Sequence, residues 1–291
     1  MLAAAAILWP AAAADAKAPI IAAAGDIACA PGGMATATTC RQAKTAALFL
    51  GNPAITAVLP LGDEQYENGA LADFQAAYAQ SWGRALAKTH PVPGNHEYAA
   101  GTNGAGYFAY FGTKRAGNAT KSWYSIHVGK WHLIALNGNC SHIGGCGSSS
   151  PQMTFLKNDL AKHHPACTLA YWHQARFSSG PQGNLSSYDA MWRVLHNHHV
   201  DVVLGGHDHG YERFALQTPD QVPDPQHGIR EFVVGTGGRS LDPFPGAFTN
   251  GQFRQDTQFG VLKLTLHPHR YEWRFVNTAK HVLDSGETDC H

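Results

Sequence analysis

The chain has 291 residues, and 44% of them are hydrophobic, which suffices for a sizeable core in one large domain or two small ones. Lysine plus arginine and aspartate plus glutamate both number 21, so the formal net charge is zero and no broad basic surface is available for a polyanion. We therefore expect no obligate nucleic-acid partner. Histidine is used heavily, with 18 residues, and imidazole is the commonest metal ligand in proteins.

The chain begins with an apolar, alanine-rich stretch that ends at Ala14. Such a stretch before small residues is typical of a secretory leader, so we predict a signal peptide over residues 1–14 and a secreted or periplasmic protein. The alternative is a disordered or buried N-terminal segment, because no Lys or Arg precedes the apolar run. No later run approaches the roughly 20 consecutive apolar residues of a membrane span, so no membrane partner is expected after leader removal.

From Pro19 onwards, short apolar runs alternate with longer segments of helical spacing, which is typical of α/β layer folds. Buried strands are predicted over residues 20–24, 55–61, 169–172 and 200–204 because these runs are short and end at Gly-Asp or histidine. Helices are predicted over residues 40–50, 70–86, 151–163 and 187–198, where apolar residues recur every three or four positions.

Further strands follow one another without helices between them. Residues 122–127 and 131–137 alternate about Gly129-Lys130 and predict a hairpin, and strands are also expected over residues 230–234, 261–266 and 271–276. The elements together indicate two mixed sheets face to face with helices outside. No repeat or linker divides residues 19–291, so we expect a single catalytic domain.

Six cysteines, an even number, favour disulfides in an exported chain. Many pairings are possible, but proximity favours Cys29–Cys40 and Cys140–Cys146. Cys167 would then tie Cys290, near the end of the chain, to a central strand.

Groups that can bind metal ions follow several of the predicted strands. They lie in the segments Gly25-Asp26, Gly62-Asp63-Glu64-Gln65-Tyr66, Gly94-Asn95-His96-Glu97, Trp172-His173 and Gly206-His207-Asp208-His209. Each segment alone has an ordinary explanation as a turn, a helix cap or a buried core residue. Their succession at strand ends predicts one shared site, because ligands of open α/β sheets bind outside the carboxyl ends of the strands.

This ordered series resembles the calcineurin-like metallophosphoesterases and, within them, the purple acid phosphatases. The resemblance covers residues 25–209 and implies an α/β fold, the four-layer αββα sandwich of two mixed sheets called the metallo-dependent phosphatase fold. It also implies two metal ions at the edge of the sandwich. It assigns the first metal to Asp26, Asp63, Tyr66 and His209, and the second to Asp63, Asn95, His173 and His207, with Asp63 bridging.

The charges of these ligands differ between the two metals. Asp26 and Tyr66 give the first site two anions, whereas the second site has only neutral ligands beside its share of Asp63. A phenolate with an ordinary pKa of about 10 requires a hard Lewis acid, so we expect Fe(III) with a divalent ion, either Fe, Zn or Mn. In the wider superfamily the first segment is commonly Asp-x-His, but Ala28 occupies that position here and Tyr66 would fill the vacancy. The alternative for Tyr66 is an aromatic packing residue.

Two further residues are candidates for catalysis. The resemblance gives His96 the role of general acid or hydrogen-bond donor to the phosphoryl group, and the alternative is a histidine that orients a ligand. The segment after His173 departs from the His-x-Pro pattern frequent in purple acid phosphatases, and Arg176 is a plausible phosphate contact there. Its alternative is a salt-bridged surface residue. Glu97 and Asp208 are candidates for orienting neighbouring histidines, and the alternative is that they face solvent.

The function expected from this set is a secreted, metal-dependent phosphatase acting on a small phosphate monoester through attack of a metal-activated hydroxide at a dinuclear centre. A phosphodiesterase or nucleotidase on the same fold is the nearest alternative. A metal-stabilised, non-catalytic secreted binding module is the alternative from another class, and the intact His96 and ligand set speak against it. The remaining histidines, including His163 and His164 at a predicted helix end, are expected to be solvated.

Overall fold

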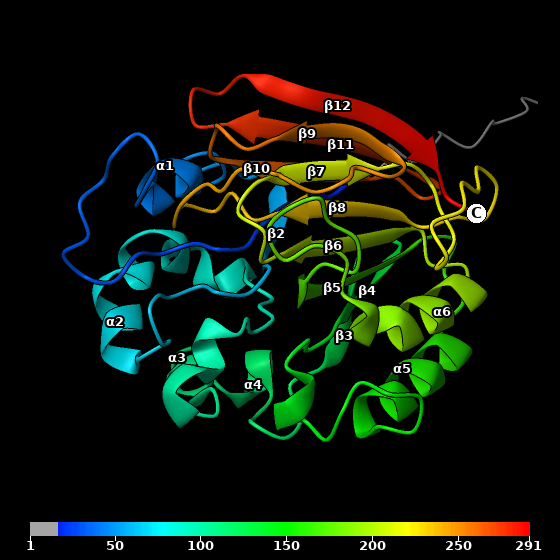
Figure 1. Ribbon diagram of the computed structural model, residues 1–291, viewed down its shortest axis with the longest axis horizontal. Helices are drawn as coiled ribbons and strands as arrows, with labels where there is room; N and C mark the ends of the chain where they lie inside the picture. The colour runs from blue at the N-terminus through cyan, green and yellow to red at the C-terminus, as the bar shows by residue number, and fades with distance from the viewer. Residues whose placement is uncertain (1–16) are drawn as a thin grey trace, which may run out of the picture.

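The computed structural model describes residues 17–291, so the predicted signal peptide over residues 1–14 lies outside the described residues. Two mixed β-sheets form the centre of the molecule (Figure 1). One sheet has five strands in the order β12-β11-β10-β1-β2, and the other has seven in the order β3-β4-β5-β6-β8-β7-β9. The predicted α/β class and the two mixed sheets are confirmed.

The five-stranded sheet consists of β1 (Ile20–Ala24), β2 (Ile55–Pro60), β10 (Gly260–Leu266), β11 (Arg270–Asn277) and β12 (Val282–Asp289). The seven-stranded sheet consists of β3 (Tyr124–Val128), β4 (Trp131–Ala135), β5 (Thr168–Gln174), β6 (Val202–Gly206), β7 (Tyr211–Phe214), β8 (Arg230–Val234) and β9 (Gly251–Gln255). The helices are α1 (Gln42–Ala46), α2 (Leu71–Ala76), α3 (Ala105–Phe111), α4 (Thr113–Ala116), α5 (Pro151–Lys162) and α6 (Asp189–Asn197). Short 3-10 helices cover Tyr78–Gln80, Trp82–Lys88, His96–Gly101, Cys140–His142 and Ser186–Tyr188.

Apolar side chains of both sheets meet in one buried core. Ile21 and Leu59 of the five-stranded sheet belong to the same cluster as Tyr171 and Leu204 of the seven-stranded sheet. A second cluster contains residues of α5 and α6 together with β4, β5 and β6, so these two helices cover the outer face of the seven-stranded sheet. Figure 1 shows α5 and α6 side by side, apart from α1 to α4.

The helix predicted over residues 70–86 is interrupted. After α2 the chain continues as two 3-10 helices, Tyr78–Gln80 and Trp82–Lys88. The backbone N–H of Tyr78 donates to the side-chain oxygen of Gln65 at 3.1 Å, and the Ser81 hydroxyl donates to the Tyr78 carbonyl at 3.2 Å. These bonds compete with the helical ladder, so a continuous helix was the wrong prediction here.

The three expected disulfides are formed, Cys29–Cys40, Cys140–Cys146 and Cys167–Cys290. The last one joins positions 123 residues apart and fastens the end of the chain beside the start of β5. Within residues 17–291, no helix is both long and apolar enough to cross a membrane.

Candidate metal centre

Hydrogen bonds connect the ends of β1, β2, β6 and β8. The N–H of Gly25 donates to the Val234 carbonyl at 2.8 Å, which links the two sheets. The N–H of Asp26 donates to the Gly62 carbonyl at 3.0 Å, and the Asp26 carboxylate accepts the N–H of His207 at 2.9 Å. The segments that follow these strands are therefore held at one edge of the sheets, where ligands of open α/β sheets are expected to bind.

Three of the seven predicted metal ligands have left-handed backbone. The φ angles are 59° at Asp26, 49° at Asp63 and 74° at His207. Few non-glycine residues adopt this conformation, and it concentrates at functional sites. Gly62, with φ at 88°, precedes Asp63, and a Cβ there would lie 2.6 Å from the ring of His173. A glycine is thus required for His173 to approach Asp63.

The first donor group contains Asp26, Tyr66 and His209, which converge on one another. The Tyr66 hydroxyl lies 3.0 Å from Asp26 Oδ1 and 3.1 Å from His209 Nε2. His209 Nε2 lies 3.2 Å from the same Asp26 oxygen. The other ring nitrogen of His209 is 2.7 Å from the Ser240 hydroxyl, which fixes the ring.

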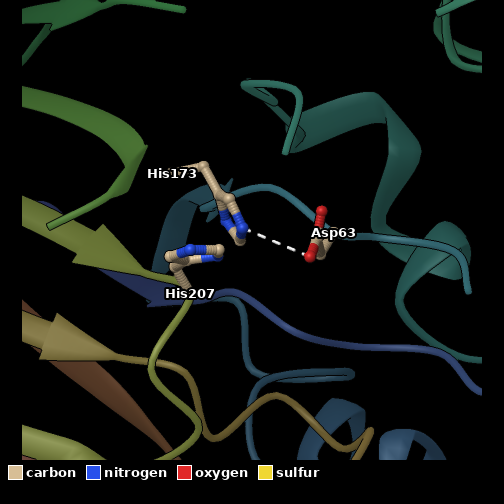
Figure 2. Close-up of side chains that lie close together, drawn as sticks. All are labelled: Asp63, His173 and His207. Atoms are coloured by element: carbon tan, nitrogen blue, oxygen red, sulfur yellow. Dashed lines mark ion pairs between the residues drawn. The ribbon is translucent and has the colours of Figure 1, made fainter. Parts of the chain in front are cut away.

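The second donor group contains Asn95, His173 and His207. His173 Nε2 lies 3.2 Å from Asn95 Oδ1, and the rings of His173 and His207 have their centroids 5.0 Å apart. Figure 2 shows both histidines reaching from strand ends toward Asp63. One ligand atom from each of Asp63, His173 and His207 lies within 4.8 Å of the others. The Leu61 carbonyl accepts Nδ1–H of His173 at 2.7 Å and leaves Nε2 facing the site.

Asp63 lies between the two donor groups. Its Oδ2 is 3.0 Å from the Tyr66 hydroxyl on one side and 3.2 Å from His173 Nε2 on the other. Its Oδ1 accepts the backbone N–H of His96 at 2.8 Å. The seven predicted ligands are thus brought together as two sets that share one carboxylate.

The electrostatics of this centre are those of a compact ionic cluster. Burial opposes ionisation of Asp63, but the positive charge of His173 prevails and holds the Asp63 pKa well below its usual range. Burial likewise disfavours the charged form of His173, yet Asp63 and Asp26 raise the His173 pKa to about 10. For His207, burial and the charge of His173 lower the pKa to about 4. His173 and Asp63 therefore stabilise each other's charged forms.

Tyr66 is protonated in this cluster. Burial and then the negative charges of Asp26 and Asp63 raise the pKa of its phenol well above 10. Only a strongly polarising cation can displace this proton near neutral pH, which is the property expected of a hard, highly charged metal ion.

Glu97 supports the centre through the backbone rather than through a histidine. Its carboxylate accepts N–H groups from Asp63 at 2.9 Å, Gly94 at 2.8 Å and Gln65 at 3.2 Å. Asp208, the other candidate for orienting histidines, accepts the N–H of Gln182 at 2.9 Å. The expectation that these acids contact ligand histidines is not met, and both are buried rather than solvated.

His96 lies at the rim of the centre. Its Nδ1 is 2.6 Å from the Glu67 carbonyl, which can only accept, so Nδ1 carries a proton. Its Nε2 lies 3.9 Å from Asp63 Oδ2, and 31% of the side chain is exposed. The ring packs on Tyr66 with centroids 4.2 Å apart. His96 therefore presents one nitrogen at the boundary between the ligands and solvent.

Arg176 does not join this group. Its guanidinium lies 3.5 Å from Asp189 at the start of α6 and 4.3 Å from the centre of the Phe177 ring. The structure thus corresponds to the salt-bridged alternative, because the carboxylate of Asp189 and the face of Phe177 already occupy the guanidinium.

A different arginine, Arg239, borders the centre and was missed by sequence reasoning. Its guanidinium lies 5.0 Å from the centre of the Tyr66 ring and 2.8 Å from a carboxylate oxygen of Glu67. The backbone N–H of Arg239 donates to the Asp26 carbonyl at 2.9 Å. The signal was the preceding glycine run at residues 235–238. A Cβ on Gly235 would lie 2.9 Å from Asp26 Oδ2, so the run lets backbone pass close to the site.

Comparisons with known proteins agree on the type of centre. Residues 20–211 match the family model described as calcineurin-like phosphoesterase. Purple acid phosphatase 15 of Arabidopsis thaliana is 30% identical over 174 residues, which cover 54% of this chain and 32% of that protein. "Probable inactive purple acid phosphatase 24" of the same plant is 26% identical over 271 residues, which cover 79% of this chain and 42% of that protein. The chain thus spans less than half the length of these relatives.

The fold is similar to that of a purple acid phosphatase, PPD1, from yellow lupin (Lupinus luteus) seeds. The TM-score is 0.80 at 21% identity, and the similarity covers 94% of this chain and 54% of that chain. The predicted resemblance to this superfamily and to its purple acid phosphatase type is confirmed.

The role of Glu97 generates a prediction about metal affinity. Glu97→Gln replaces one acceptor oxygen by an amide donor that faces backbone N–H groups, so Asp63 loses part of its support. We expect divalent-ion affinity to fall about 10–100-fold, measured by competition with a chromophoric chelator.

Glu64→Gln is the matched control for this substitution. Burial and the charge of Glu97 raise the pKa of Glu64 well above its usual range, so its side chain is neutral and glutamine resembles it closely. Equal affinities in the two variants would contradict the role of Glu97.

Proposed function

Because the chain belongs to the calcineurin-like phosphoesterase family, we propose that it is an exported phosphatase that hydrolyses small phosphate monoesters at a dinuclear metal centre. The observation that carries this proposal is the position of Asp63 Oδ2, about equally far from Tyr66 of one donor group and His173 of the other. A single carboxylate in that position can serve two metal ions at once.

The residues present fit such a pair of ions. Asp26, Tyr66, His209 and Asp63 would hold one ion, and Asn95, His173, His207 and Asp63 the other. The donors of each group lie close to one another, and the glycine at position 62 leaves the room that this approach needs. Bound ions of this kind act as Lewis acids on the ester oxygens and lower the pKa of water.

The protein contributes orientation and proton transfer. Asp63 is held by the N–H of His96 and by the support of Glu97 on its own N–H, so its carboxylate has a fixed direction. His96, with Nδ1 bonded to a carbonyl, can present a protonated Nε2 to the leaving-group oxygen. We assign it the role of general acid or phosphate hydrogen-bond donor.

The first ion is proposed to be Fe(III) and the second a divalent ion, Fe, Zn or Mn. The support is the anionic first donor group and the phenol of Tyr66, whose pKa lies well above 10 without a metal. A trivalent ion compensates the charges of Asp26, Asp63 and a Tyr66 phenolate better than a divalent one.

A non-catalytic metal-binding module is the competing function, and two of the similar plant proteins carry the word inactive in their names. All seven donors and a partly exposed His96 are present together in this chain. A binding module that catalyses no reaction has no chemical need for His96 at this position. This combination favours the hydrolase.

Asp63→Ala tests the centre as a whole. Loss of the shared carboxylate is expected to remove both metal ions and to reduce turnover of p-nitrophenyl phosphate by at least a thousandfold, because two-metal catalysis needs both ions. Metal is counted by elemental analysis. Asp220→Ala, an exposed carboxylate paired with Arg193, is the matched control and should behave as wild type.

The same assay separates the substrate classes. Wild type is expected to prefer p-nitrophenyl phosphate to bis(p-nitrophenyl) phosphate. A preference for the diester would show that the protein is a phosphodiesterase rather than a monoesterase. Near-normal activity of Asp63→Ala would refute the proposed metal centre.

Tyr66→Phe tests the iron assignment. A phenolate bound to Fe(III) produces a charge-transfer band in the visible spectrum, and removal of the hydroxyl is expected to abolish that band. Tyr98→Phe, which removes a hydroxyl bonded to Asn137 rather than to a predicted ligand, is the control. An active, colourless and iron-free wild-type enzyme would exclude the iron assignment while leaving the two-metal hydrolase intact.

His96→Ala tests the proton-transfer assignment. We expect kcat for p-nitrophenyl phosphate to fall about 100-fold or more while both metals stay bound, because the variant loses a proton donor but no ligand. His142→Ala, an exposed histidine near Asn103, is the control. Loss of metal in His96→Ala would instead identify His96 as a residue that positions the ligands.

A further inference from the structure

A second cluster of metal-binding side chains lies away from the centre, where the β3–β4 hairpin meets α5. It consists of His127 on β3, His132 on β4, Asp159 on α5 and His163 directly after α5. We propose that these four residues bind one divalent transition-metal ion of the zinc class. The inference is independent of the hydrolytic function proposed above.

The fold determines that these residues face one another. His127 and His132 are directly opposite in the antiparallel hairpin, so their side chains lie on the same face of the sheet. Asp159 and His163 are four residues apart and share one face of the helix end. The hairpin face and the helix face are in contact, because Asp159 Oδ2 lies 2.6 Å from His132 Nε2.

Ligand atoms of three of the four residues are already gathered around Asp159. His163 Nδ1 lies 3.0 Å from the backbone carbonyl of Asp159 and 3.4 Å from its Oδ1, which leaves Nε2 as the nitrogen for an ion. One ligand atom from each of His132, Asp159 and His163 lies within 4.8 Å of the others. The Ser125 hydroxyl donates to Asp159 Oδ1 at 2.7 Å and orients the carboxylate. Such a supporting bond is usual for a carboxylate that binds a metal ion.

The three imidazole rings have the spacing of a tetrahedral site. Their centroids are separated by 4.9 Å for His127 and His132, 5.5 Å for His127 and His163, and 4.6 Å for His132 and His163. With a zinc–nitrogen distance of about 2.0–2.1 Å, tetrahedral geometry places ring centroids about 5 Å apart. The observed triangle therefore needs little adjustment to surround one ion.

Burial and charge also favour an ion here. His132 is fully buried, and its Nδ1 has no hydrogen-bond partner within residues 17–291. Three neutral imidazoles and one carboxylate carry a single negative charge, which a divalent ion overcomes. His127 is exposed, so an ion can enter from solvent.

The chemistry indicates a structural ion rather than a second catalytic one. Four protein ligands fill a tetrahedral shell, and structural zinc sites are closed in this way. His132 is paired with Thr168 at the start of β5, whereas His173 lies five residues further along that strand, about 16 Å away. The ion would fasten β3, the edge strand of the seven-stranded sheet, to α5.

The test compares zinc binding by full-length variants. Wild type, the double variant His127→Ala/His163→Ala and the control His164→Ala are equilibrated with Zn²⁺, freed of unbound ion by gel filtration and analysed for zinc. We expect the double variant to retain one zinc fewer per chain than the other two. Zn²⁺ should also raise the Tm of wild type and the control by several degrees more than that of the double variant.

The readouts separate this site from the hydrolytic centre. Turnover of p-nitrophenyl phosphate is expected to be the same in all three proteins, since the altered residues lie outside that centre. His132 is left unchanged because its substitution in the core threatens folding. Equal zinc content and equal zinc-dependent Tm shifts in all three proteins would overturn the proposal and leave a histidine cluster bonded to Asp159.

Discussion

The architecture of the hydrolytic centre depends on how tightly the chain turns as it leaves the strands. Asp26, Asp63 and His207 leave their strands through left-handed backbone, which costs roughly 1–3 kcal/mol at each non-glycine residue. The Asp26 carboxylate accepts the N–H of His207, and Glu97 accepts the N–H of Asp63, so two of the three strained residues are held by a buried hydrogen bond to a carboxyl group. The strain and its compensation both exist before any ion binds. The ligands are therefore preorganised.

This preorganisation gathers ionisable side chains in a buried site. A proton on His173 compensates the Asp63 carboxylate, so the pKa of His173 is raised to about 10 and the pKa of Asp63 is held far below its usual range. A bound cation would take over the role of that proton, so metal uptake and proton release are linked. His207, with a pKa of about 4, is already neutral and can offer its lone pair at once. The two histidines of the second donor group thus differ, because His173 must lose a proton before it binds an ion and His207 need not.

Sequence reasoning succeeded where one interaction dominates locally. Buried strands such as β1 and β6 were visible as short apolar runs, and the ligand series was visible because four of its five segments follow such a run. The interrupted helix was not predictable, since its break depends on a hydrogen bond from Tyr78 to Gln65, thirteen residues away. Strand β12 was missed because its exposed, polar sequence carries no apolar alternation.

The side chains around the ligands were harder to predict, because their contacts depend on segments far apart in the sequence. Arg176 follows a predicted ligand strand and looked suitable for phosphate, but the start of α6 supplies Asp189 to its guanidinium. Arg239 comes from a glycine-rich turn far along the sequence and reaches the Tyr66 ring only through the three-dimensional fold. Likewise, His127 and His163 looked like separate surface histidines, because nothing local shows that a hairpin and a helix end will meet.

What distinguishes a hydrolase from a metal-stabilised module is found at the rim rather than among the ligands. A stabilising ion needs donors that saturate its shell, and the four donors proposed at His127, His132, Asp159 and His163 would do so. The hydrolytic centre differs because His96 sits beside the ligands with its Nδ1 bonded to the Glu67 carbonyl, while about a third of its side chain remains open to solvent. A fixed, titratable nitrogen at the boundary between a charged site and water has a use only if protons are exchanged with something that arrives from solution. This position of His96 is therefore the strongest physical reason to regard the centre as one that turns over a substrate.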